Sequence, residues 1–150
     1  MRAPMQILVI PYKIIDGKPE YCILKRSDAL YWQFIAGGGE DKETPLEAAR
    51  REAFEEANIE LTLPYYRLTS TFYVPADCIS EKHRQYWPAD TFVLPEYCFA
   101  VNMDSKSVKL SSEHTEYSWV TYEKAEEMLY WQTNKIALFE LNNRIKSNVF

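Results

Sequence analysis

The stretch AGGGEDKETPLEAARREAFEEANI, residues 36–59, decides the fold, because a glycine run leads directly into a strongly acidic helical pattern. Thr44 suits the N-cap position, the proline after it suits the first helical position, and Glu47 stands three residues beyond the cap. This is a capping box with proline just inside the helix. Asn58 can adopt the left-handed conformation that ends a helix. The pattern therefore predicts a helix over about residues 45–57.

Three glutamates crowd one surface of this predicted helix. Glu52, Glu55 and Glu56 stand at i, i+3 and i+4, a spacing at which like charges repel one another. A solvated acidic surface is one interpretation of this pattern. The other is a metal site, because oxygen ligands close to a glycine loop suit a hard divalent cation such as Mg²⁺. A bound cation would turn the repulsion into binding energy.

Beside these glutamates the helix has a narrow apolar stripe, formed by Leu46, Ala49, Ala53 and Ala57. Most of these side chains are alanines, which allow a helix backbone to lie close to a sheet. The sequence therefore predicts a helix packed closely on a sheet through its small residues.

The same stretch resembles the Nudix box, G-x5-E-x7-R-E-U-x-E-E-x-G-U, in which U is a bulky aliphatic residue. The matching positions are Gly37, Glu43, Arg51, Glu52, Glu55, Glu56 and Ile59. The sequence departs from the pattern where Ala53 is smaller than the usual aliphatic residue and where Asn58 replaces the last glycine. Every charged position matches at the required spacing, so the motif is specific.

The resemblance implies a Nudix-type α/β/α sandwich with a mixed sheet between helices. It also implies hydrolysis of a nucleoside diphosphate linked to another group, with Mg²⁺ or Mn²⁺ as the cofactor. The metal ligands implied by the resemblance are Glu52, Glu55, Glu56 and the backbone carbonyl of Ala36. Glu43 and Arg51 are implied to be a structural pair that steadies the glycine stretch against the helix. In some family members the general base is the glutamate equivalent to Glu52, and in others the base comes from a later loop.

A second resemblance points to the segment SSEH, residues 111–114. The order of L-K-R, Y-W-Q, the box and S-E-H-x-x-Y-x-W-V is similar to the dATP pyrophosphohydrolase, or dihydroneopterin triphosphate pyrophosphatase, branch of the Nudix family. Taken alone, Glu113 is an ordinary surface acid. The resemblance implies that Glu113 is a metal ligand or the base, and that the substrate is a triphosphate cleaved to monophosphate and pyrophosphate.

The composition predicts one domain over residues 1–150. The net charge of −5 argues against an extended nucleic-acid partner, which requires a basic surface.

The three cysteines are odd in number, lack metal-ligand spacing and indicate reduced thiols, so we expect a cytoplasmic protein. No apolar run is long enough to span a membrane. The sequence does not determine the oligomeric state.

The remaining elements follow from hydrophobic patterns and turn residues. Strands are predicted over residues 5–15, 20–26, 31–35, 91–103 and 117–121, and one long strand or two short ones over 61–74. Pro11 is expected at a bulge or an edge, and residues 104–107 form a predicted turn. Helices are predicted over 122–130, capped by Thr121, and over 134–147, capped by Thr133.

Substrate contacts are the least determined part of the prediction. Arg26 ends a strand and either is solvated there or binds phosphate. Trp32 and Trp87 either pack locally or stack on a base or pterin ring. The long polar segment 75–90 is expected to be a lid or part of the substrate pocket, with His83 more simply explained as an exposed loop residue.

Three functions are compatible with these residues. The first is a Mg²⁺-dependent pyrophosphohydrolase acting on a nucleoside or pterin triphosphate. The second is a Nudix hydrolase of a dinucleoside polyphosphate, a nucleotide sugar or a capped RNA end. The third is a Nudix-fold module that binds a nucleotide without cleaving it. The intact R-E-x-x-E-E run favours the enzymes, because a binding module does not need every metal ligand.

Overall fold

The computed structural model describes residues 1–104 and 107–150. In chain order, its elements are β1 (Arg2–Ile15), β2 (Lys18–Arg26), β3 (Trp32–Gln33), β4 (Ile35–Glu40), α1 (Pro45–Ala57), β5 (Tyr65–Pro75), the 3₁₀ turn η1 (Ala76–Cys78), α2 (Glu81–Arg84), β6 (Val93–Asn102), β7 (His114–Val120), α3 (Tyr122–Met128) and α4 (Gln132–Ser147).

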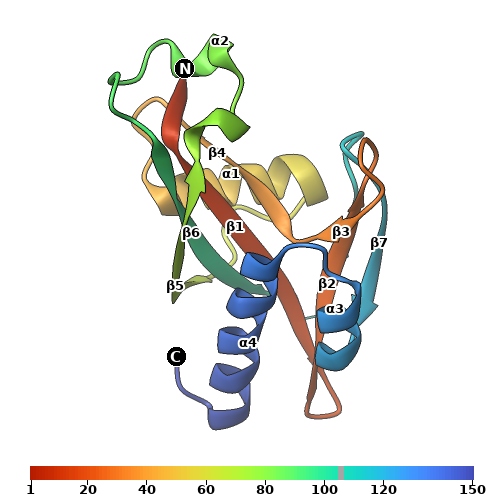
Figure 1. Ribbon diagram of the computed structural model, residues 1–150. Coiled ribbons are helices and arrows are strands. Elements are labelled where there is room, and N and C mark those ends of the chain that lie inside the picture. The colour runs from red at the N-terminus through yellow and green to blue at the C-terminus, as the bar shows by residue number, and fades with distance from the viewer. Residues whose placement is uncertain (105–106) are drawn as a thin grey trace.

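A seven-stranded mixed sheet is built around β1. Its main order is β3-β2-β1-β6-β5, while β4 pairs with the first part of β1 and β7 pairs with β2. The β1–β6 pair is parallel, and the other strand pairs are antiparallel. Figure 1 shows β1 running through the centre of the molecule, with α1 beside its upper half and α3 and α4 beside its lower half.

Alternate residues of β1 face two separate hydrophobic cores. Ile7 and Val9 pack with the buried alanines of α1, whereas Leu8 and Ile10 pack with residues of α3 and α4. Successive residues of a strand point to opposite faces of a sheet, so helices cover both faces. The predicted α/β/α sandwich with a mixed sheet is therefore confirmed.

Helix α1 has the ends that the sequence predicts. The Thr44 side chain accepts a hydrogen bond from the Glu47 backbone, and the Glu47 side chain accepts one from the Thr44 backbone. Asn58 ends the helix in the left-handed conformation, with φ of 55°. The alanine stripe is fully buried at Ala49, Ala53 and Ala57. These features are local, so the sequence alone predicts them.

The glycine stretch is a strand rather than the predicted loop. Gly37 and Gly38 lie in β4 and pair with Ile7 and Gln6 of β1. The partner strand satisfies backbone groups that a loop would leave to water. This pairing is tertiary and leaves no local signature in a run of glycines.

Pro11 lies at neither a bulge nor an edge, so that prediction is wrong. The pairing of β1 with β6 continues through Pro11 without interruption. On the other side of β1, the partner changes from β4, whose pairing ends at Val9, to β2, whose pairing begins at Tyr12. Proline is accommodated in this central strand where that side has a gap between partners.

The C-terminal elements begin and end differently from the prediction. Helix α4 begins at Gln132 with Trp131 at its N-cap, so the predicted cap at Thr133 is wrong. The Trp131 indole donates a hydrogen bond to the Gln33 side chain, and this tertiary contact places the start of the helix. Helix α3 ends at Met128, two residues early, because the Tyr130 backbone N–H donates to the Trp32 carbonyl.

Two other boundaries differ in smaller ways. β7 begins at His114, earlier than predicted, because its pairing with β2 extends to Arg26. The segment 61–74 contains one strand, β5, which starts just after Pro64. The predicted turn at 104–107 includes residues 105–106, which lie outside the described residues. Among the helices of the described residues, none is both long and apolar enough to cross a membrane.

Candidate active site

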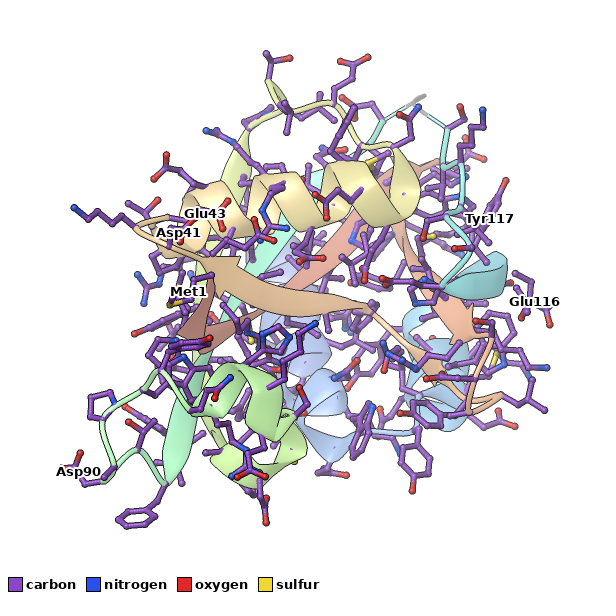
Figure 2. The ribbon with its side chains drawn as sticks, turned by 90° about the horizontal axis from the view of Figure 1, so that it is seen from above. Met1, Asp41, Glu43, Asp90, Glu116 and Tyr117 are labelled. Carbon is purple, nitrogen blue, oxygen red and sulfur yellow. The ribbon has the colours of Figure 1, made fainter. Side chains whose placement is uncertain are left out.

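Arg51 of α1 ties the helix to the strand that precedes it. Its guanidinium forms two contacts with Glu43, Nε–Oε2 of 2.8 Å and Nη2–Oε1 of 3.0 Å. It also donates to the Gly38 carbonyl at 2.8 Å. The hydrogen bond from Arg51 is the main cause that lowers the pKa of Glu43. The geometry is that of a clamp across the β4–α1 turn, where Figure 2 shows Glu43.

The glycines of β4 make room for charged side chains. A Cβ atom added at Gly37 would overlap the Glu52 carboxylate. A Cβ atom added at Gly38 would overlap the guanidinium of Arg2. Any larger residue at Gly37 would therefore displace one of the box glutamates. This requirement for close approach explains the glycine at the first position of the motif.

The three box glutamates have different surroundings. Glu56 is 4% exposed, Glu52 is largely buried, and Glu55 has an exposed side chain. Glu52 and Glu55 both contact Arg51, at 3.0 and 3.2 Å. Burial raises the pKa of Glu52, against the opposing effect of Arg51. Three carboxylates on one surface of the same helix therefore differ in character.

The Glu56 carboxylate lacks full hydrogen bonding. Its Oε2 atom is buried and has no partner among the described residues. Burial raises the pKa of Glu56 to about 10, and a hydrogen bond with Glu113 acts in the same direction. A hydrogen bond from the Ala36 backbone opposes the rise. A buried carboxylate is costly unless another group compensates its charge, so this site favours the arrival of a cation.

The loop before β7 is fastened to the end of α1. The Ser111 N–H donates to the Glu56 carbonyl at 3.0 Å, and the Lys109 N–H donates to the Ala57 carbonyl at 3.0 Å. On the other side, the Ser27 N–H donates to the Glu113 carbonyl at 3.0 Å. These bonds hold Glu113 beside Glu56, although the two residues are far apart in the sequence.

His114 completes this cluster, and the sequence prediction did not include it among the site residues. Its imidazole is 5% exposed, and neither ring nitrogen has a hydrogen-bond partner in the described residues. Ligand atoms of Glu56, Glu113 and His114 all lie within 4.8 Å of one another. Burial lowers the pKa of His114, so a neutral imidazole is favoured. The signal in the sequence was the S-E-H segment, in which only the glutamate was singled out.

The chemistry of these residues fits a divalent cation. The cluster offers carboxylate oxygens and an imidazole, which are ordinary ligands of divalent ions. The Oε2 atom of Glu56 is buried and has no partner among the described residues. The negative charges of Glu52 and Glu113 raise the pKa of this carboxyl group. The structure thus brings together Glu52, Glu56 and Glu113 from the predicted set. It leaves Glu55 exposed beside Arg51.

The predicted substrate residues lie in two different places. Arg26 and Trp32 lie on neighbouring strands beside the Glu113 loop, where Arg26 is opposite His114 in the sheet. The Arg26 guanidinium is paired with Asp28 through two contacts of 2.7 Å. Trp87 lies elsewhere, next to the N-terminal end of β1, and donates its indole N–H to the Arg2 carbonyl at 2.8 Å.

The segment 75–90 forms η1 and α2 and borders a pocket of about 470 Å³. Arg2, Glu40, Lys82 and Tyr86 are among the lining residues. Arg2 is half-buried, and the charge of Glu52 raises its pKa against the larger lowering effect of burial. The pocket therefore adjoins the N-terminal end of β1 and the last residue of β4, and the role of segment 75–90 in substrate binding stays a prediction. No motif in the sequence points to Arg2.

The comparisons with known proteins agree with this geometry. The NUDIX domain family profile matches residues 8–140. The chain is 30% identical over 125 residues to the dihydroneopterin triphosphate diphosphatase of Escherichia coli, covering 79% of each chain. It is 27% identical over 139 residues to the Haemophilus influenzae protein of the same name, covering 88% of this chain and 83% of the relative.

A solved structure of a Listeria monocytogenes protein described as a NUDIX hydrolase is also similar to this chain. Its sequence is 42% identical, the match covers 97% of both chains, and the TM-score is 0.87. The box residues, the sandwich fold and these matches together show that the chain belongs to the Nudix family of phosphoanhydride hydrolases.

Proposed function

We propose that this Nudix hydrolase cleaves a nucleoside or pterin triphosphate to a monophosphate and pyrophosphate, with Mg²⁺ or Mn²⁺ as its cofactor. The observation that supports this most strongly is the buried, unpartnered oxygen of Glu56 beside Glu113. A phosphoanhydride carries several negative charges, so an acidic site requires cations to receive it. The names of the Escherichia coli and Haemophilus influenzae relatives favour a triphosphate.

Glu52, Glu55, Glu56 and Glu113, together with the Ala36 carbonyl, are the groups proposed to hold the cations. Bound divalent ions supply charge neutralisation for phosphate oxygens and lower the pKa of water. Glu43 and Arg51 position these ligands through the clamp across the β4–α1 turn. Phosphoryl transfer depends mainly on such positioning and charge stabilisation.

Glu52 is the proposed general base. Its carboxylate lies over Gly37 and outside the Glu56–Glu113 contact, and burial raises its pKa toward values that accept a proton more readily. Glu113 is the alternative, because its loop is fastened next to the same helix end. Measured at saturating Mn²⁺, so that a weakened ligand set is still loaded, a Glu52→Gln variant that loses most of its kcat while Glu113→Gln retains it would support Glu52. The same pattern in Glu113→Gln, with Glu52→Gln still active, would assign the base to Glu113.

Arg26 and Trp32 are proposed to meet the substrate on the side of the site formed by β2 and β3. Both lie next to the strand that begins with His114. Release of Arg26 from Asp28 would present its planar guanidinium to a phosphate, which it can bind through two hydrogen bonds. Trp87 has an indirect proposed role, because its hydrogen bond to Arg2 holds the pocket beside α2 in place.

A substrate panel tests this proposal. The purified protein is incubated with dATP, dihydroneopterin triphosphate, diadenosine tetraphosphate or ADP-ribose, each with Mg²⁺ and each without a divalent ion. Release of pyrophosphate and of phosphate is measured separately. We expect metal-dependent pyrophosphate release from a triphosphate, with no free phosphate as a primary product.

Other outcomes would contradict the proposal in different ways. Preferred turnover of diadenosine tetraphosphate or ADP-ribose would assign the site to another linked nucleoside diphosphate. Tight nucleotide binding by calorimetry, without turnover of any phosphoanhydride, would identify a binding module.

A further inference from the structure

A buried histidine with two unpaired nitrogens distinguishes this metal cluster from one built only of carboxylates. His114 is 5% exposed, and both of its ring nitrogens lack hydrogen-bond partners in the described residues. Buried polar atoms in proteins normally have a partner. Ligation of a metal ion would satisfy one of these nitrogens. None of the roles derived above for the carboxylates accounts for the imidazole.

The backbone holds His114 at this position firmly. Its N–H donates to the Ser111 carbonyl, and the Ser111 N–H in turn donates to the Glu56 carbonyl at the end of α1. His114 is also the first residue of β7 and lies opposite Arg26 in β2. The ring is therefore placed beside Glu56 by a strand and by a loop that is bonded to α1, and sites built on rigid elements hold their ligands precisely.

The spacing of the three side chains suits a single ion. Ligand atoms of Glu56, Glu113 and His114 lie within 4.8 Å of one another. Two oxygen or nitrogen ligands of one divalent ion, each about 2.1 Å from it, lie about 3–4.2 Å apart. A small contraction of the cluster around the ion therefore produces a three-ligand site.

We propose that His114 is a nitrogen ligand to the ion held by Glu56 and Glu113, and that this mixed site favours a first-row transition ion such as Mn²⁺ over Mg²⁺. Imidazole binds transition metals well, whereas Mg²⁺ prefers oxygen ligands and water. The inference rests on the proposed metal-dependent function and specifies which ion one of its sites selects.

Nitrogen coordination can be measured directly in the intact protein. Electron spin echo envelope modulation of bound Mn²⁺ detects a coordinated nitrogen, and selective ¹⁵N labelling of histidine identifies its source. The chain contains only two histidines, His83 and His114, so His83→Gln is a matched control. We expect histidine nitrogen modulation in the unaltered protein and in His83→Gln, and its loss in His114→Gln.

Affinity measurements supply the second test. Titration by electron paramagnetic resonance should show Mn²⁺ binding weakened about 10-fold or more in His114→Gln, with Mg²⁺ affinity, measured by competition, changed less than about 3-fold. Circular dichroism would establish that the variant is folded. Mn²⁺ bound to the unaltered protein without histidine nitrogen modulation would overturn the inference, and that result does not depend on any variant.

The two proposals fail in different ways. Metal-dependent hydrolysis without a histidine signal would remove the role of His114 and leave the proposed function intact. A histidine signal without turnover of any phosphoanhydride would remove the proposed function and retain the metal site.

Discussion

Two glutamates on different helices show how the same side chain serves different purposes. Glu140 of α4 accepts hydrogen bonds from the backbones of Thr69 and Ser70 at 2.7 Å each, and from Arg144 at 2.8 Å. Burial alone would raise its pKa, but these bonds, with one from the Ser70 hydroxyl, lower the pKa to about 2. Glu140 is therefore a satisfied anion that joins α4 to β5.

Glu56 of α1 is the opposite case. One of its oxygens has no partner in the described part of the chain, and its carboxyl faces a second carboxyl at Glu113. Its pKa is raised to about 10. The Glu140 carboxylate receives hydrogen bonds from two backbone N–H groups, a hydroxyl and a guanidinium. One oxygen of Glu56 receives none from the described residues. An acid that the protein leaves uncompensated is a candidate ligand for something outside the chain.

The largest expected effect comes from replacing Glu56 with an amide, which cannot become a charged metal ligand. Glu56→Gln should lower metal-dependent hydrolysis by about 10²- to 10³-fold, because a bound metal contributes several kcal/mol to the transition state. The fold should remain intact, since the buried carboxyl already favours its neutral form. Activity with Mg²⁺ is the measurement, and Glu123→Gln on the exposed surface of α3 is the control. Undiminished turnover in Glu56→Gln would contradict the metal assignment.

Another buried glutamate tests whether a raised pKa by itself marks a functional residue. Glu96 of β6 is 7% exposed, and burial raises its pKa to about 7. Between pH 4.5 and pH 7, the folded state holds this proton more tightly than the unfolded state, so stability falls as pH rises through that window. Glu96→Gln should therefore raise the free energy of unfolding at pH 8 by about 1–3 kcal/mol.

The measurement for Glu96 is urea denaturation at pH 5 and at pH 8, together with Mn²⁺ titration. We expect the gain in stability to be confined to the higher pH and Mn²⁺ affinity to be unchanged. Loss of Mn²⁺ binding in Glu96→Gln would place this carboxyl in the metal site and weaken the comparison between Glu56 and Glu140.

Substitution of Glu140, whose carboxylate is fully hydrogen-bonded, should affect stability rather than catalysis. Glu140→Gln should reduce the free energy of unfolding by about 2 kcal/mol at pH 7, because it weakens charge-assisted hydrogen bonds to Arg144 and to the β5 backbone. Its lowered pKa gives stability that is present above about pH 4.5 and is lost as pH falls toward 2. The variant should therefore lose part of this acid dependence in urea denaturation, with kcat unchanged.

The smallest effect concerns the start of the box helix. Thr44→Ala removes the side chain that accepts a hydrogen bond from the Glu47 N–H at 3.2 Å. The expected cost is about 1 kcal/mol of stability, measured by thermal or urea denaturation. Thr44→Ser retains the hydroxyl and should recover most of the loss. Equal losses in both variants would show that the methyl group, rather than the cap, accounts for the effect.

The accuracy of the sequence prediction varies with the range of the interactions involved. The box helix was predicted with its capping box, its Asn58 end and its alanine stripe, because each depends on residues within a few positions. The glycine strand β4 and the N-terminus of α4 were predicted incorrectly, because pairing with β1 and the contact of Trp131 with Gln33 define them. The site shows the same dependence on range. A family resemblance points to Glu113, whereas His114 is not among the predicted site residues.

The sequence by itself determined the acidic helix, the family to which it belongs and the residues that can bind a cation. It could not determine which acid is left without a partner, because Glu52, Glu55 and Glu56 carry the same charge on the same surface of the helix. Only the tertiary structure decided this, by placing Arg51 beside two of them and fastening the loop before β7 against the third. Burial and hydrogen bonding control the state of a carboxylate, and both depend on neighbours that the fold brings from distant parts of the chain.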